Sequence, residues 1–530
     1  MQTGFPTIGA VTRFLFNAAG VLAQKDDSLG LLLSEKDKKS LQTRLKRLTD
    51  EDGELEENLN DVLSLLMGCV DKISPSPRVT AAIAESIWDL LVQYSDLVRN
   101  EGTYLGVKDT LGYVLKSKLV GRAVVSSQKN VLLFNLKDLG LSTPEDEYWF
   151  LPDIHDDCLV WPLEKAMRWA YSVADTSQTH FHFPGKNVKS ENFQLSQNLE
   201  SAENWLHARS LPNWGVLHTN LMESFAAMEA CSDSQHQRQL PESTQAQVVL
   251  VVFIARAATY ITQEIDKHYG RDVLLQLLDQ FKEQSQVLRS DVHAHMSSTI
   301  EKLIGEAATA KGSPPQEVID CIWRDSVPQY WWDVGRFFAQ AGEETQSFLL
   351  ENHGEPLTQE QLTYIERRYG PYFFTCLKHG LDISESYPMP QGFMELVVEG
   401  ESLLNRNSSL NQVRVYKESV EKSSWSTALS WLAEWNEGSL HMRNGDQKLA
   451  HKHLGNAFGL GKYCAGDRQK PLVQGYLEVC AKVQSWKDFK KAFAWARYLQ
   501  IPVRLWDSEW EESMDNVKTL YTMYQHMEFA

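Results

Sequence analysis

Residues Ser196 to Phe225, SQNLESAENWLHARSLPNWGVLHTNLMESF, predict a short helix, a Pro-marked break and a second helix. The apolar residues of the first helix recur at helical spacing and would bury one face; they are Leu199, Ala202, Trp205 and Leu206. Its polar residues would then form the opposite face: Gln197, Asn198, Glu200, Ser201 and Asn204. Two short helices joined by a tight break are the layout with which many proteins read DNA.

Most of the remaining sequence also has helical periodicity. Between residues 31 and 100, apolar residues recur every three or four positions in LLLSEKDKKSLQTRLKRL, LEENLNDVLSLLMGCVDKI and VTAAIAESIWDLLVQYSDLVRN. Turn-forming residues separate these segments at 50–54 and 74–77, so we expect an antiparallel helical bundle. At 122–136, RAVVSSQKNVLLFNL has two β-branched or apolar runs around a polar centre and predicts a β-hairpin.

The length of the chain and its turn-rich stretches predict several units. A chain of 530 residues is too long for one hydrophobic core. Boundaries are indicated at 142–165, which leads into a helix beginning near Pro162, at the polar stretch 231–247, and at KGSPPQ, 311–316. We therefore expect an all-α protein with four units: a helical bundle with a small hairpin (1–141), a helix-turn-helix-like unit (142–240), a helical hairpin (241–312) and a helical repeat-like domain (313–530).

Small and apolar residues in the last unit stand where antiparallel helices would approach closely. Gly438, Ala450, Leu454 and Ala457 form one such set, and a second set follows about forty residues later: Cys480, Ala492 and Ala496, with Pro502 beyond. This pattern resembles a degenerate tetratricopeptide repeat, although the signature Trp, Gly and Tyr of that family are mostly absent. The resemblance implies an α-solenoid that binds a protein partner, and the alternative is an irregular helical domain.

Composition and charge restrict the classes of protein to which the chain can belong. The formal net charge of −18 repels nucleic-acid phosphates, so a DNA contact must be confined to one local patch. The seven cysteines include no CxxC pair, which indicates reduced thiols and a cytoplasmic location. The longest apolar run, 248–255, is shorter than the about 20 residues that a transmembrane helix needs. We expect a buried segment there and no membrane contact.

The helix-turn-helix candidate resembles the Cro and phage-repressor type of DNA-binding domain. Trp205, Arg209, Pro212 and Leu217 stand where that family has an aromatic, a short linker, a proline and its fourth helix. The resemblance implies base contacts from Gln197, Asn198, Glu200, Ser201 and Asn204, with Arg209 near the DNA backbone. The family's second helix is not legible upstream, and the alternative interpretation is an ordinary bundle helix with a Pro-marked end.

A second functional signal is the sequence QVLRSDVHAHMSST, which contains Arg289, His293 and His295. An Arg followed closely by a His on a helical hairpin resembles the HEPN-type ribonucleases, in which these residues would polarise the scissile phosphate and move protons. This chain has Ser290 where that family commonly has Asn, Asp or His. The alternative interpretation of Arg289 and His295 is ordinary surface charge.

The remaining histidine and glycine motifs predict no metal or cofactor. His180 and His182 alternate with phenylalanines, and His155 lies beside Asp156 and Asp157, but neither group has ligands at metal-binding spacing. His451 and His453 are expected to face solvent. The run GLGKYCAGD at 459–467 lacks the spacing of a phosphate-binding loop and predicts a helix end and a turn.

Two aromatic groups remain, one at 330–338 (Tyr330, Trp331, Trp332, Phe337, Phe338) and one at 369–374 (Tyr369, Tyr372, Phe373, Phe374). We expect them to be core, with a groove for a partner peptide as the alternative.

Taken together, the motifs favour a non-enzymatic, bacterial-type regulatory or antiviral defence-associated protein that binds double-stranded DNA locally and a protein partner through its C-terminal region. A protein-interaction scaffold without nucleic acid and a helical ribonuclease are the alternatives.

Overall fold

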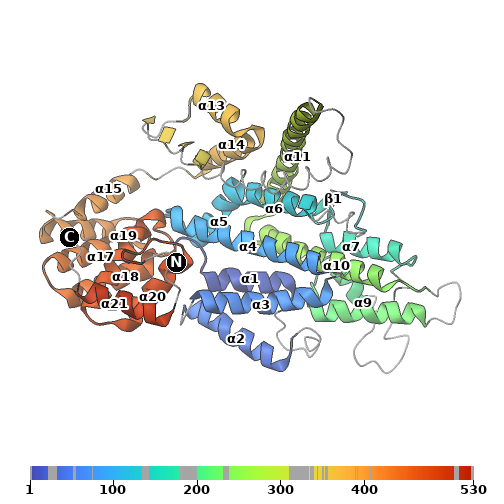
Figure 1. Cartoon of the computed structure of the whole chain (residues 1–530), viewed down its shortest axis with the longest axis horizontal. Coiled ribbons are helices and arrows are strands. Elements are labelled where there is room, and N and C mark those ends of the chain that lie inside the picture. Colours follow the sequence, from blue (N-terminus) through green and yellow to red (C-terminus); the bar gives the residue numbers. More distant parts are fainter. Residues whose placement is uncertain are drawn as a thin grey trace.

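The computed structural model confirms an all-α protein (Figure 1). It describes residues 3–21, 33–51, 55–74, 76–133, 142–156, 158–178, 181, 200–230, 238–308, parts of 334–352, 356–387, 390, 392–405, 407–506 and 513–526. The C-terminal helices gather at one end of the molecule in Figure 1, helices α1–α4 lie beside them, and α7, α9 and α10 extend toward the other end.

The helical bundle expected between residues 31 and 100 is confirmed. The helices are α1 (Ile8–Ala19), α2 (Glu35–Asp50), α3 (Leu55–Ile73) and α4 (Pro77–Asn100). Thr7, Ser34 and Ser76 cap the starts of α1, α2 and α4, because each side chain accepts a hydrogen bond from a backbone N–H of the first turn. Neighbouring helices α1–α2, α2–α3 and α3–α4 pack against each other.

The hairpin expected at 122–136 is wrong over its described part, because α6 (Val120–Leu133) occupies residues 122–133. Val120, Val124 and Gln128 are buried, and this four-residue spacing belongs to a helix face and not to a strand. The two valines pack with α11 and α14 through Leu288 and Tyr372, so tertiary packing overrides the β-propensity of the valines. The helix is continuous with α5 (Val107–Val114) through a π-helical turn, Leu115–Leu119.

A short hairpin instead lies in the segment that was expected to be a connection. Strand β1 (Asp153–His155) pairs antiparallel with β2 (Cys158–Val160), with Ile154 opposite Leu159. Asp156 has a φ of 48° in the turn, a conformation that Asp tolerates better than most residues. The helix expected near Pro162 is confirmed as α7 (Pro162–Val173).

Helix α10 (Glu242–Tyr269) is the central element of this part of the molecule. It packs against α1, α3, α7, α9 (Trp214–Glu229) and α11 (Arg271–Ala308). The run 248–255 lies within it, and all but Ile254 of that run is buried, as expected. By length and mean hydropathy α10 is, among the described residues, the one helix apolar enough to cross a membrane. However, 56% of its most apolar window is buried in the protein, which is typical of a core helix.

Arg256 of α10 is buried, with only 4% of its surface exposed. Its guanidinium donates hydrogen bonds to the backbone carbonyls of Asn17 (2.7 Å), Ala18 (2.5 Å) and Pro212 (3.0 Å). These carbonyls end α1 and precede α9, so one side chain joins three elements that are distant in sequence. Burial lowers the pKa of Arg256 to about 10, which leaves the guanidinium charged at neutral pH.

The C-terminal region is an array of helices in which sequence neighbours pack together. Helices α13 (Gln359–Tyr369) and α14 (Pro371–Ser386) precede it. Its elements are α15 (Phe393–Leu403), α16 (Leu410–Lys422), α17 (Ser426–Arg443), α18 (Gln447–Gly461), the 3₁₀ turn η3 (Gly466–Arg468), α19 (Gln469–Lys482), α20 (Trp486–Tyr498) and α21 (Met514–His526). The helix end and turn expected at 459–467 are confirmed by the end of α18 at Gly461.

The close approach expected at Gly438 is confirmed, because an added Cβ there would lie 2.7 Å from Leu454 Cγ. Ala450, Leu454 and Ala457 are buried, as are Cys480, Ala492 and Ala496. Both α17 and α19 end in the same hydrogen-bond pattern: Asp446 N donates to His441 O, and Ser485 N donates to Cys480 O. Gly445 and Gln484 precede these residues with positive φ values of 81° and 61°. The two helix ends are 39 residues apart in the sequence, so this geometry aligns Phe493 with Leu454 and Ala496 with Ala457.

The N-terminal residues and the C-terminal array share contacts. Phe5 N donates to Tyr463 O (2.8 Å), and Thr103 N donates to Cys464 O (2.9 Å). The Lys462 ammonium, with a side chain only 10% exposed, forms an ion pair with Glu51 at the end of α2. Burial and the charge of Lys491 lower the pKa of Lys462 to about 7, and the Glu51 carboxylate acts in the opposite direction. The main core runs from Phe5 to Tyr524 and crosses all the expected unit boundaries.

Replacing Gly438 by Ala tests the close approach of α17 and α18. An added Cβ would lie 2.7 Å from Leu454 Cγ and 2.9 Å from Leu454 N, so a helix must move. We expect Gly438→Ala to lower the free energy of unfolding by about 1–3 kcal/mol, measured by chemical denaturation. Gly475→Ala is the matched control, because nothing lies within 4 Å of its added Cβ, and it should be neutral or stabilising. If Gly438→Ala stabilised the protein as much as Gly475→Ala, the close contact between Gly438 and Leu454 would be contradicted.

Candidate functional site

The described part of the helix-turn-helix candidate folds as a helix at 200–206, a break and then α9. Glu200, Ser201 and Arg209 are exposed and Asn204 is half-buried, whereas Ala202 and Leu206 are buried as the periodicity predicted. Ala208, with a φ of 52°, ends the first helix. Gln197 and Asn198, the other two residues expected to contact bases, lie outside the described residues, as does the segment where a preceding helix would be.

The aromatic residue that anchors this segment is Trp214 and not Trp205. Trp214 is completely buried at the start of α9, and its ring packs edge-on against Phe253 of α10. Trp205 is only half-buried. The surface around the first helix is acidic as well as basic, because Glu200 and Glu203 are exposed and Arg168 already pairs with Glu164 (2.6 Å).

The structure does not bring Arg289 and His295 together. Both lie on α11, but six residues along an α-helix correspond to a rotation of about 120° between their side chains. Arg289 donates a hydrogen bond to Gln128 (3.2 Å), forms an ion pair with Glu147, and lies over the ring of Tyr148. His295 is exposed, and His293, one turn from Arg289, lies 3.4 Å from the Ser297 hydroxyl.

The other sequence motifs are placed as follows. His155 and Asp156 are exposed at the hairpin turn, while Asp157, His180 and His182 lie outside the described residues. Tyr369, Tyr372 and Phe373 are buried, which confirms core packing for these three, whereas Phe374 of the same group is half-buried. The group at 330–338 contributes only Val334 to the described residues. His451 and His453 do not face solvent freely, because both are half-buried and contact carboxylates of neighbouring helices.

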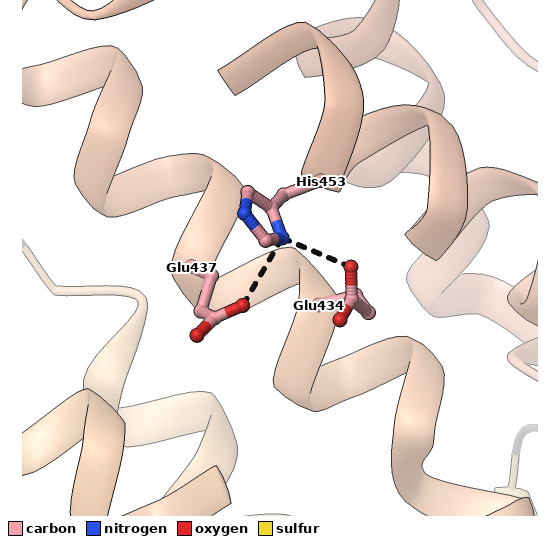
Figure 2. Close-up of side chains that lie close together, drawn as sticks. All are labelled: Glu434, Glu437 and His453. Atoms are coloured by element: carbon pink, nitrogen blue, oxygen red, sulfur yellow. Dashed lines mark hydrogen bonds and ion pairs between the residues drawn. The ribbon is translucent and has the colours of Figure 1, made fainter. Parts of the chain in front are cut away.

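His453 belongs to a cluster of half-buried charged side chains, here called the His453 cluster, which consists of Lys417, Glu434, Glu437 and His453, together with the exposed amide of Asn456. Glu434 and Glu437 are one turn apart on the same side of α17, and His453 faces them from α18 (Figure 2). His453 directly precedes Leu454 in the sequence, and the Leu454 side chain packs at Gly438. The close crossing of α17 and α18 therefore brings the imidazole to the two carboxylates.

The distances within the cluster are those of direct hydrogen bonds and ion pairs. His453 Nδ1 lies 3.0 Å from Oε2 of Glu434 and 3.0 Å from Oε2 of Glu437 (Figure 2). Lys417 Nζ, from α16, lies 3.2 Å from Glu434 Oε1 and 2.8 Å from Glu437 Oε2. Asn456 Nδ2 donates to Glu434 Oε2 at 2.9 Å. One lysine, one imidazole and one amide thus surround two acidic groups.

These contacts shift the pKa values of the charged groups. Burial alone would raise the pKa of Glu434, but hydrogen bonds from Asn456, His453 and Lys417 and the charge of Lys417 together lower it. Burial alone would lower the pKa of Lys417, but the hydrogen bonds and charges of Glu437 and Glu434 raise it. The cluster therefore stabilises the charged forms of Glu434 and Lys417.

Sequence reasoning missed this cluster, although two signals were present. The first is the spacing of Glu434 and Glu437, which places two carboxylates on one helix face. The second is the position of His453 directly before Leu454, one of the residues expected at the helix crossing. Combining them required knowing which faces of the two helices meet.

Searches of protein-family models, curated proteins and solved structures found no match to this chain.

Replacing Lys417 by Met tests the charge balance of the cluster. A lowered folded-state pKa of Glu434 contributes stability above the unfolded pKa, and this contribution is lost as the pH falls through the folded pKa. We expect Lys417→Met to cost about 1 kcal/mol at pH 7 and progressively less below pH 4. Denaturation at several pH values measures this, with the exposed Lys422→Met on the same helix as a control that should change little. A cost independent of pH would show that packing, and not charge, is lost.

Proposed function

We propose that this protein is a non-enzymatic helical binding protein that holds a protein partner on its C-terminal region. The observation that supports this is the exposure of large apolar side chains on two contacting helices, α15 and α16. Met394 and Val398, one turn apart on α15, are 44% and 58% exposed, and Leu410 and Val415 of α16 are 64% and 50% exposed. These four side chains are called the α15–α16 surface below. Met394 and Val398 lie on one face of α15, whereas Leu410 and Val415 lie about 140° apart around α16. Exposed apolar side chains on neighbouring helices suit a protein-interaction site.

The packing beneath this surface suits a rigid docking site. The absent side chain of Gly400 allows α15 to approach Tyr416 and Leu432, because an added Cβ would lie within 2.6 Å of both residues. Asn436 of α17 donates to the Gly400 carbonyl at 2.9 Å in the core. Side chains presented by helices held in this way lose little conformational freedom on binding.

The free, buried thiols of Cys69, Cys376, Cys464 and Cys480 support placing the protein in a reducing compartment such as the cytoplasm.

Site-specific photo-crosslinking tests the partner hypothesis. A photoreactive amino acid at position 398, in the full chain expressed in its source cells, should give a discrete adduct that mass spectrometry identifies. Met394→Glu should weaken capture about tenfold, since hot-spot residues contribute more than about 1 kcal/mol. The same photoreactive group at the exposed Glu421 of α16 is the control and should give no such adduct. Identical adducts at both positions, or none at 398, would refute the proposal.

Local DNA binding is a second candidate function, favoured by the helix, break and helix at 200–229 with Glu200, Ser201 and Arg209 exposed. The exposed carboxylates of Glu200 and Glu203 lie on the same short helix and would repel DNA phosphates. We propose weak binding that fades steeply with salt, as expected for an acidic protein with one local contact patch.

Fluorescence anisotropy with a mixed-sequence duplex at several salt concentrations tests this candidate. Arg209→Ala should weaken binding and reduce the slope of log K against log salt by about 1, whereas Asn204→Ala and Gln197→Ala should relax sequence preference. Arg414→Ala on the exposed face of α16 is the charge-matched control and should leave binding unchanged. If the wild-type chain does not bind duplex DNA even at low salt, this function is excluded.

A further inference from the structure

We propose that Glu434, Glu437 and His453 bind a zinc ion between α17 and α18. One imidazole and two carboxylates are a ligand set that Zn²⁺ accepts, and three protein ligands leave a position for water or for a group from a partner. The three side chains contribute one ligand atom each, and these atoms lie within 4.8 Å of one another. Among the described residues, no other group of three His, Cys, Asp or Glu side chains has this proximity.

The distances require little rearrangement for zinc to enter. Ligand atoms about 2.1 Å from a tetrahedral ion are about 3.4 Å from each other. His453 Nδ1 is 3.0 Å from each of the two carboxylate oxygens that it contacts. Each ligand atom therefore moves by less than about 1 Å to reach the geometry of a zinc site. Figure 2 shows that the imidazole nitrogen and both carboxylates converge on the same space.

The helices that carry the ligands are held firmly. Ala450, Leu454 and Ala457 of α18 are completely or almost completely buried against their neighbours, and Gly438 sets the distance between α17 and α18. Sites built on packed helices keep their ligands close to the bound geometry. The side chains of Glu434, Glu437 and His453 are 15%, 22% and 16% exposed, which is enough for a hydrated ion to reach them.

Two further residues, Asn456 and His441, orient the side chains of the proposed ligands. Asn456 holds Glu434 Oε2 with a hydrogen bond of 2.9 Å and thereby orients this carboxylate. The ring of His441 stacks on that of His453, with 5.5 Å between centroids and 13° between planes, and restricts rotation of the imidazole. Asn456 and His441 are therefore positioning residues for the proposed ligands.

Lys417 is the intrinsic competitor of the metal. Its ammonium contacts both carboxylates and so occupies part of the space where a cation is favoured. The side chain is 29% exposed on a flexible stem, which allows it to move into solvent when a divalent ion with twice its charge enters. Removal of the Lys417 charge should consequently strengthen metal binding, whereas removal of any proposed ligand should weaken it.

The ligand chemistry selects zinc over magnesium and calcium. Both of these ions prefer six or more oxygen ligands, while the cluster offers only two carboxylates and one nitrogen. Imidazole nitrogen is a favoured ligand of zinc and of neighbouring transition metals. Cobalt(II) can replace zinc as a spectroscopic probe, because its visible spectrum reports coordination by protein ligands.

The test is a zinc titration of the full-length, chelator-treated chain by isothermal calorimetry, with magnesium as comparison and cobalt absorption as a second readout. We expect one zinc site per chain that His453→Ala weakens by more than about 100-fold, since loss of a mere positioning partner already costs about 10–100-fold. Asn456→Ala should fall within that smaller range, and Lys417→Met should bind more tightly than wild type. Zinc should also raise the melting temperature of the wild-type chain.

The matched control is His451→Ala on the same helix, whose imidazole pairs with Asp488 at 3.1 Å outside the cluster, and it should leave zinc affinity unchanged. Circular dichroism verifies that each variant remains helical, and Glu437→Gln replaces His453→Ala if the latter unfolds. Unchanged affinity in a folded His453→Ala or Glu437→Gln variant would overturn the proposal. So would the absence of a zinc site in both the wild type and Lys417→Met.

Discussion

The buried guanidinium of Arg256 joins α1, α10 and the break before α9, and the arrangement of the N-terminal half depends on it. Burying a charge costs free energy unless hydrogen bonds compensate, and here the carbonyls of Asn17, Ala18 and Pro212 do so. Gly20 leaves the space that the guanidinium needs, because an added Cβ would lie 2.7 Å from it. Trp214 N also donates to Gly20 O (3.1 Å), so the start of α9 is tied to the end of α1.

Contacts of a different kind join this half to the C-terminal array. The ion pair between Lys462 and Glu51 is shielded by aromatic rings, with the Lys462 ammonium 5.6 Å from the centre of Trp495. Tyr463, the next residue, donates to the same glutamate and accepts a backbone hydrogen bond from Phe5 through its carbonyl. A single turn after α18 thus carries the contacts that hold the array against α2 and the N-terminal residues. The shared core contains residues from each of the four expected units.

The proposed sites follow from how closely the C-terminal helices approach. Gly438 and Leu454 allow α17 and α18 to cross at short range, and this crossing places His453 between Glu434 and Glu437. Gly400 similarly lets α15 lie close to α16, so that Met394 and Val398 face outward from a rigid base. A zinc ion bridging α17 and α18 would strengthen the same crossing on which the α15–α16 surface rests through Asn436. Partner binding and metal binding would then depend on one set of packed helices.

The sequence by itself determined the all-α class, the bundle helices between residues 35 and 100, the buried face of 200–206 and the small residues at the α17–α18 crossing. These features depend on periodicity and turn chemistry, which are local properties of the chain. Only the tertiary structure decided that 120–133 is a helix, since its valines gain more by packing against α11 and α14 than their β-propensity favours. It alone also revealed Trp214 as the anchor and His453 as part of a charged cluster, because both depend on which helix faces meet. Such pairings join residues from different helices, as with the Arg256 guanidinium and the Asn17 carbonyl, and no local pattern encodes them.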